Sequence, residues 1–204
     1  MSRYLGAALL LSLCISCSSD VHKIKTRSLL QKNPTSYVFP GALPEVRGKI
    51  LAAFRDFPTS REFASFISPN NRSFMVSVRT NEEHGDYEPI FASPENRDDI
   101  YLHSWGEPID PSEVYYGGGV PLRYRAEFQL HLTAPNDNST QISVITHKPS
   151  VINGSVCCSP HGYKSNDVAV ESTTIEEYRI LLFIGRLLGV SDMPTLRLPE
   201  GKPE

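Results

Sequence analysis

The chain has 204 residues, a formal net charge of −3 and a hydrophobic content of 40%, values typical of one globular domain. A nucleic-acid surface normally needs a strong basic excess, so we expect no nucleic-acid partner. After residue 13 no apolar run approaches the ~20 residues that a membrane-spanning helix needs. The mean hydropathy of −0.26 fits a body exposed to water.

Residues 1–16 have the three-part layout of an export signal. Arg3 supplies the positive charge, an apolar run extends from Leu5 to Leu13, and small residues lead up to Cys17. The apolar run is too short to span a bilayer. The sequence therefore predicts that the chain is exported and that this signal is removed.

The end of the signal, Leu-Cys-Ile-Ser-Cys at residues 13–17, resembles the lipobox of bacterial lipoproteins, in which a small residue precedes a cysteine that becomes the acylated N-terminus. The resemblance implies that Cys17 is lipidated. Cys14 fits less well, because Leu13 would then occupy the small-residue position. Ser18, and not Asp, follows the anchor, which by the same resemblance favours the outer membrane if the organism has one. The alternative is an ordinary secretory signal that is cut nearby.

A polar segment follows the predicted anchor. Residues 17–35 comprise the lipidated cysteine and a stretch without a long periodic stripe, which we interpret as a tether between lipid and domain. Its cations either lie against anionic head groups or form a solvated run; they are Lys23, Lys25, Arg27 and Lys32. We assign residues 36–192 to a single domain and residues 193–204, with three prolines, to a loosely held tail.

The first half of the domain begins with a short β-type run at residues 36–40. An apolar stripe predicts a helix over about residues 43–56. Pro58 ends this helix, and a capping box at residues 59–62 predicts a second short helix after it.

The period of the apolar residues then changes to two, which indicates that the rest of the domain is mainly β. Short strands are predicted at residues 73–79, 89–92 and 100–105. Residues 106–121 contain prolines and the run Gly117-Gly118-Gly119, so we expect a long, mobile loop. These glycines lack the Lys and the Ser or Thr of a phosphate-binding loop.

The clearest signal is a strand over residues 122–133, in which apolar and polar residues alternate without error. Such a strand belongs to an antiparallel sheet with one apolar and one wet face. A turn at residues 135–139 leads to a returning strand. The register that keeps the apolar faces together pairs Leu130 with Val144.

A short strand at residues 167–171 and a helix over residues 175–188 complete the domain. A capping box from Thr174 to Glu177 opens this helix, and Gly189 ends it. The order of elements resembles that of helix-grip domains, which include START-like and Bet v 1-like proteins. We therefore expect an α+β fold, with two short N-terminal helices and a C-terminal helix packed on one face of a curved antiparallel sheet. A TBP-like saddle fits the same pattern.

The sequence Cys-Cys-Ser-Pro-His at residues 157–161 is open to several interpretations. Adjacent cysteines are poorly placed to bind one tetrahedral zinc ion, and a nucleophilic cysteine beside His161 would lack an orienting acid. In an oxidising compartment Cys157 and Cys158 can form a vicinal disulfide. Otherwise they are ordinary loop thiols.

Three histidines fall on predicted strands: His103, His131 and His147. In the register above, His131 faces Ser143 and Glu127 faces His147, all on the wet side. We expect an exposed ion pair between Glu127 and His147, worth at most ~1 kcal/mol. No metal site, cofactor or catalytic residue is predicted.

These features predict a lipid-anchored binding or scaffolding module of the cell envelope, with an envelope protein as a candidate partner and no motif for an enzyme. The alternative is a carrier of a small apolar ligand, held between the sheet and the last helix. Solid packing there would leave no room for a ligand. The residues that would line this pocket are Tyr124, Phe128, Leu130, Val144, Tyr178, Leu181 and Leu182.

Overall fold

The computed structural model describes residues 22–28, 31–55, 75–80, 98–105, 114–159 and 162–202. Several sequence predictions lie outside these residues. Among them are the signal with Cys17, the second short helix after Pro58, and the strand at residues 89–92.

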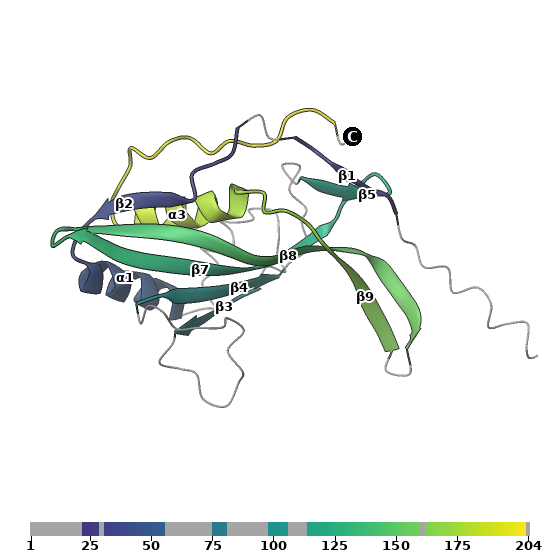
Figure 1. The fold of residues 1–204 in the computed structure, drawn as a ribbon, viewed down its shortest axis with the longest axis horizontal. Coiled ribbons are helices and arrows are strands. Elements are labelled where there is room, and N and C mark those ends of the chain that lie inside the picture. The colour runs from purple at the N-terminus through teal and green to yellow at the C-terminus, as the bar shows by residue number, and fades with distance from the viewer. Residues whose placement is uncertain are drawn as a thin grey trace, which may run out of the picture.

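An antiparallel sheet forms the centre of the molecule (Figure 1). The strand order is β2-β8-β7-β4-β3, and β9 pairs with β8 beside this path. The strands are β2 (Ser36–Pro40), β3 (Met75–Thr80), β4 (Ile100–Trp105), β7 (Arg123–Asn136), β8 (Ser139–Ser159) and β9 (Gly162–Ala169).

The β7–β8 hairpin has the predicted register. Leu130 pairs with Val144, and His131 pairs with Ser143. Buried and more exposed residues alternate along β7, so the prediction of one apolar face is confirmed. The turn is tighter than expected, because β7 continues through Pro135 to Asn136.

Strand β8 is 21 residues long, and it bends along its length. Its register with β7 shifts between Arg125 and Glu127, next to Lys148, whose φ of 48° is unusual for a residue other than glycine. A second shift, against β9, lies next to Gly154, with φ of 83°. Bulges of this kind increase twist and bend a strand. The end of β8 leaves the main sheet with β9 as a two-stranded arm (Figure 1).

Helices α1 (Leu43–Arg55) and α3 (Ile175–Leu187) pack against one face of this sheet. Their apolar stripes join the sheet's inner residues in one core cluster, in which Ile50, Leu130 and Tyr178 are each 0% exposed. The α+β class and the antiparallel sheet are therefore confirmed. Within the described part of the chain, neither helix is long and apolar enough to cross a membrane.

The start of α3 differs from the predicted capping box. Thr174 adopts a left-handed conformation with φ of 60° and makes no side-chain cap hydrogen bond. Its hydroxyl instead accepts the N–H of Asn33, at 2.9 Å. The hydroxyl of Thr173 accepts the N–H of Ile175, at 3.1 Å. The Thr174 hydroxyl, which a capping box would use, is thus taken by the distant residue Asn33. At the other end, Gly189, with φ of 76°, ends the helix as predicted.

A second sheet includes residues that were predicted to belong to the tether at 17–35 and to the mobile loop at 106–121. Strand β1 (Ile24–Thr26) pairs with β5 (Tyr115–Gly117), which pairs with β6 (Val120–Pro121). The turn between β5 and β6 is Gly118-Gly119, with φ of 59° and 86°. Two successive positive φ values are what a tight hairpin turn requires and what glycine supplies. The glycines therefore make a defined turn, where a mobile loop was expected.

The C-terminal tail also has a defined course, in place of the loose one expected. It runs beside the N-terminal segment (Figure 1). The carbonyl of Pro194 accepts a hydrogen bond from the Tyr178 hydroxyl, and the carbonyl of Pro199 accepts one from the Arg27 guanidinium. The N–H of Glu200 donates to the carbonyl of Ser28. Prolines lack an N–H group but keep the carbonyl acceptor, so a proline-rich tail can still be held by hydrogen bonds.

Candidate functional site

The seven residues proposed to line an apolar pocket do come together, as part of the packed core. Five of them are between 0% and 3% exposed and belong to the main core cluster: Phe128, Leu130, Val144, Tyr178 and Leu181. Tyr124 and Leu182 are partly buried and pack against this cluster. Side chains from the sheet and α3 therefore fill the space between them.

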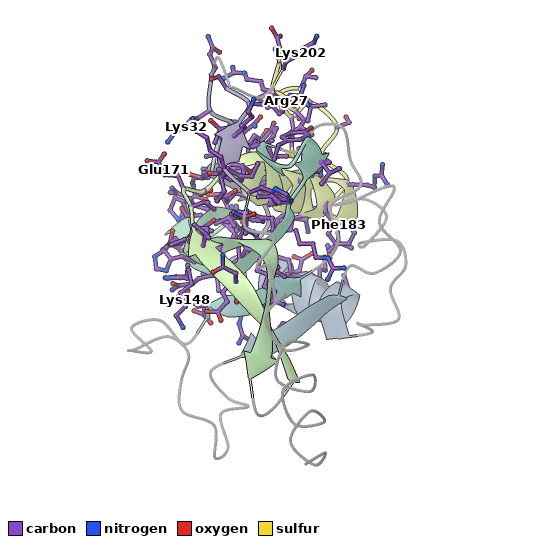
Figure 2. All side chains as sticks on the ribbon, turned by 90° about the vertical axis from the view of Figure 1, so that its right-hand side faces the viewer. Arg27, Lys32, Lys148, Glu171, Phe183 and Lys202 are labelled. Carbon is purple, nitrogen blue, oxygen red and sulfur yellow. The ribbon has the colours of Figure 1, made fainter. Side chains whose placement is uncertain are left out.

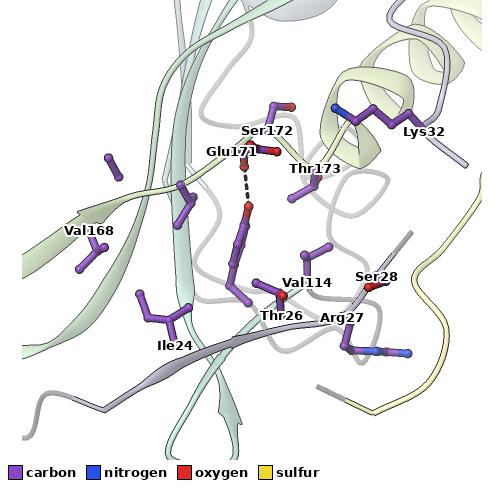
Figure 3. Close-up of a pocket in the computed structure, with 13 residues that line it drawn as sticks. Ile24, Thr26, Arg27, Ser28, Lys32, Val114, Val168, Glu171, Ser172 and Thr173 are labelled. Atoms are coloured by element: carbon purple, nitrogen blue, oxygen red, sulfur yellow. Dashed lines mark hydrogen bonds between the residues drawn. The ribbon is translucent and has the colours of Figure 1, made fainter. Parts of the chain in front are cut away.

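A cavity of about 490 Å³ lies elsewhere, beneath the N-terminal segment (Figure 3). Its volume is in the range of small-molecule sites. Strand β1, the start of β5, the end of β9 and the segment before α3 surround it. The lining residues are Ile24, Thr26, Arg27, Ser28, Lys32, Val114, Tyr115, Val168, Ala169, Val170, Glu171, Ser172 and Thr173.

The inner wall of the cavity is mostly apolar. It belongs to a second core cluster that includes Val114 and Tyr115 and against which Ile24 packs. Tyr115 donates its hydroxyl to the carbonyl of Glu171, at 2.7 Å, and its ring stacks on Tyr124 with 6.4 Å between centroids. Burial raises the pKa of Tyr115, and the negative charge of Glu171 raises it further. The hydroxyl therefore stays protonated and remains a donor.

The rim of the cavity is polar and carries two cations. The Arg27 side chain points away from the cavity (Figure 3); its guanidinium lies 2.8 Å from the carbonyl of Pro199 and 3.4 Å from the hydroxyl of Tyr116. Lys32 extends from the other side toward Ser172 (Figure 3). Lys32 is thus the better placed of these two cations to meet a negative group.

Two buried acids lie behind the polar wall, in the first turn of α3. Glu176 accepts a hydrogen bond from the hydroxyl of Thr173. Glu177 accepts hydrogen bonds from the hydroxyls of Ser172 and Thr146. Burial raises the pKa of Glu176, and the neighbouring charge of Glu177 adds to the rise. Sequence reasoning noted only a capping role here, because nothing in the pattern showed that these acids are buried.

The open face of the sheet carries a polar network that sequence reasoning missed in part. Asp99 is 2% exposed; it accepts a hydrogen bond from Gln129 at 2.7 Å and lies 3.1 Å from Nδ1 of His131. Nε2 of His147 lies 3.0 Å from Oε1 of Gln129. Asp99 precedes β4 by one residue, so only the strand pairing brings it next to His131.

The predicted register pairing of Glu127 with His147 is confirmed. The expectation of an exposed pair is wrong for Glu127, whose side chain is only 13% exposed. Burial lowers the pKa of His147 more than the nearby charge of Glu127 raises it. Lys148 lies beside the same carboxylate, with 3.7 Å between Nζ and Oε2. In the described ranges no three His, Cys, Asp or Glu side chains are grouped so that they could hold a metal ion.

Cys157 and Cys158 lie on the arm formed by β8 and β9. The ladder between these strands shifts register between Val156 and Ser159, which places the two cysteines at the irregularity. Their side chains, and His161, lie outside the described residues. The vicinal disulfide therefore stays a prediction.

His103 occupies the position on β4 that pairs with Glu127, and its side chain is not among those described.

Comparison of this chain with protein-family models, with curated proteins and with solved structures finds no match.

Proposed function

We propose that this chain is a lipid-anchored, non-enzymatic binding or scaffolding module of the cell envelope, acylated at Cys17 and facing the periplasm from the outer membrane where the organism has one. The observation that carries the proposal is the attachment of the N-terminal segment. His22, five positions after Cys17, exchanges two backbone hydrogen bonds with the side chain of Asn153. An acyl group on Cys17 would thus hold the domain close to the membrane in a restricted orientation.

The helix-grip arrangement is part of this proposal. Its support is the packing of α3 along the sheet, where Leu181 and Ile184 share one core cluster with Phe128 and Val144. A binding role fits the exposed elements that such a core leaves available, the open polar face and the arm of β8 and β9 (Figure 1).

Metabolic labelling of the full chain in a bacterial host with an alkyne fatty acid tests the anchor. The wild-type chain should incorporate the label and sediment with membranes, and Cys17→Ser should abolish the label. Cys14→Ser is the matched control and should keep it, because Cys14 lies in the segment that is removed. Labelling that survives Cys17→Ser would refute the anchor at this residue.

The second candidate function is a carrier, and the cavity beneath β1 favours it over a purely structural module. Its apolar wall and the Lys32 ammonium at its rim suit an amphipathic molecule with an apolar body and an anionic end. The core between the sheet and α3 is less suited to a ligand, because its central side chains are almost fully buried against one another.

Native mass spectrometry of the purified lipidated chain tests the carrier. A bound small molecule should appear in the wild-type spectrum and be lost in Val168→Trp, which fills the cavity. Val38→Trp, at an exposed site outside the cavity, should retain it. A wild-type protein that never carries a bound molecule would refute the carrier function and would leave the proposed scaffolding function unaffected.

A further inference from the structure

The first described residue lies within a short reach of the predicted anchor. Four residues separate Cys17 from His22, and an extended chain spans at most ~3.6 Å per residue. His22 therefore lies within roughly 18 Å of Cys17. It is held there by Asn153, which is 2% exposed, through hydrogen bonds of 3.2 Å to its N–H and 2.6 Å to its carbonyl.

Strand β1 sorts its side chains into two faces. Because side chains alternate along a strand, Ile24 and Thr26 line the cavity, and Lys25, between them, lies on the outer face. Arg27, just after the strand, is part of the cavity rim, but its side chain points away from the cavity (Figure 3). Lys23 and Lys25 are exposed. Two exposed lysines therefore lie at this end of the N-terminal segment, with Lys25 on the face opposite the cavity.

The partner strand adds an aromatic ring to this outer face. Tyr116 pairs with Lys25 across β1 and β5, and its hydroxyl lies 3.4 Å from Arg27 Nη1. Tyrosine and lysine combine an apolar body with a polar tip, which suits them to the interface between water and lipid.

The turn between β5 and β6 lies beside His22. A side-chain Cβ at Gly118 would come within 3.0 Å of the His22 ring, so the turn and the start of β1 are in close contact. The turn is followed by Val120, whose side chain is 61% exposed. An exposed aliphatic residue is thus placed next to the point where the chain arrives from Cys17.

The C-terminal tail brings further cations to the same end of the molecule. Arg197 donates to the carbonyl of Lys32, at 3.1 Å, and Arg27, Lys32 and Lys202 gather at one end in Figure 2. The exposed carboxylate Glu171 lies at the same end (Figure 2), so these cations are accompanied there by a negative charge.

From this placement we propose that the outer face of β1, together with the β5–β6 turn, lies on the anionic phospholipid head groups of the membrane that holds Cys17. The inference rests on the proposed lipid anchor. Each Lys close to an anionic surface strengthens binding by ~1 kcal/mol, which is about fivefold in affinity. The anchor supplies attachment, and this face sets the orientation of the domain.

Vesicle binding by the full chain carrying Cys17→Ser tests the face without the acyl group. Vesicles with phosphatidylglycerol should bind it more tightly than vesicles of phosphatidylcholine alone. Lys23→Gln with Lys25→Gln should lower the affinity for phosphatidylglycerol vesicles by about 25-fold. The matched control, Lys49→Gln with Lys148→Gln, removes the same charge elsewhere and should change the affinity for phosphatidylglycerol vesicles less than twofold. Equal losses in both pairs, or no preference for phosphatidylglycerol, would overturn the proposal.

Tryptophan quenching in the lipidated chain tests the orientation. The single tryptophan is removed by Trp105→Phe, and Val120→Trp is compared with Ile145→Trp, since Ile145 is also exposed, at 41%, but lies on the open sheet face. Brominated phospholipids should quench Trp at position 120 and spare Trp at position 145. Equal quenching, or none at position 120, contradicts the proposal even when fatty-acid labelling at Cys17 is intact. Loss of labelling with the vesicle preference retained would instead refute the anchor alone.

Discussion

Asn33 and Arg197 lie 164 residues apart and exchange two hydrogen bonds. The Asn33 amide donates to the Arg197 carbonyl at 2.9 Å and accepts the Arg197 N–H at 2.8 Å. Asn153 and His22 repeat this arrangement across 131 residues. One amide side chain supplies both the donor and the acceptor that a passing backbone needs. Two buried asparagines therefore attach the two terminal segments to the domain.

Replacing Asn33 should destabilise the fold. Asn33 is 4% exposed, and Asn33→Ala leaves the N–H and carbonyl of Arg197 without these partners. We expect the free energy of unfolding to fall by about 2–3 kcal/mol, measured by urea denaturation. Asn138→Ala, in the exposed turn after β7, is the control and should change it by less than about 0.5 kcal/mol. Equal values for the two variants would show that the Asn33 bonds contribute nothing.

Replacing Asn153 should loosen β1 locally. Asn153→Ala removes both hydrogen bonds to His22, so we expect β1 to open more often. Trypsin should then cleave after Lys23 and Lys25 about tenfold faster, the result of about 1.4 kcal/mol in the opening equilibrium. Mass spectrometry of the N-terminal fragments measures the rate, with Asn138→Ala again as control. An unchanged rate would mean that pairing with β5 alone holds this segment.

The buried acid Glu176 should make stability depend on pH. Burial raises its pKa above the ordinary value of 4.5, so the folded state binds the proton more tightly than the unfolded state. Its favourable contribution is complete below pH 4.5 and is lost as the pH rises through the higher folded value. Glu176→Gln should therefore be more stable than the wild type at pH 7, and this advantage should vanish near pH 4.

Urea denaturation across this pH range compares the two proteins, and Glu45→Gln is the control. Lys49 lowers the pKa of the exposed Glu45, so this variant should show no gain at neutral pH. If the difference in the free energy of unfolding between Glu176→Gln and the wild type does not vary with pH, the raised pKa of Glu176 is contradicted.

Replacing the strained residue Lys148 by glycine should stabilise the fold. Its φ of 48° is in the left-handed region, which costs a side chain with a Cβ about 1 kcal/mol. Lys148→Gly should therefore raise the melting temperature, with a gain of about 0.5–1 kcal/mol. Lys148→Ala removes the same ammonium group near Glu127 but keeps the Cβ, and it should give no gain. A similar rise in both variants would assign the effect to charge and not to the backbone.

The sequence by itself determined the elements whose side chains repeat with a clear period. The alternation over residues 122–133 predicted β7 and its register with β8, because a one-residue slip would expose the apolar face. The apolar stripe predicted α3 for a similar reason, since a helix must cover such a stripe. These features depend on neighbours along the chain or on one adjacent strand.

Tertiary structure alone decided how the two terminal segments and the cavity are built. Nothing periodic marks β1, because three residues that pair with β5 are too few to show a pattern. Asn33 and Asn153 belong to no periodic pattern in the sequence, and their attachment to Arg197 and His22 depends on contacts across more than a hundred residues. The hydrogen-bond partner of a polar side chain cannot be predicted from the sequence when the fold brings that partner from a distant segment. For that reason the sequence could predict an anchor at Cys17, but the contacts that hold the following segment against the domain are visible only in the fold.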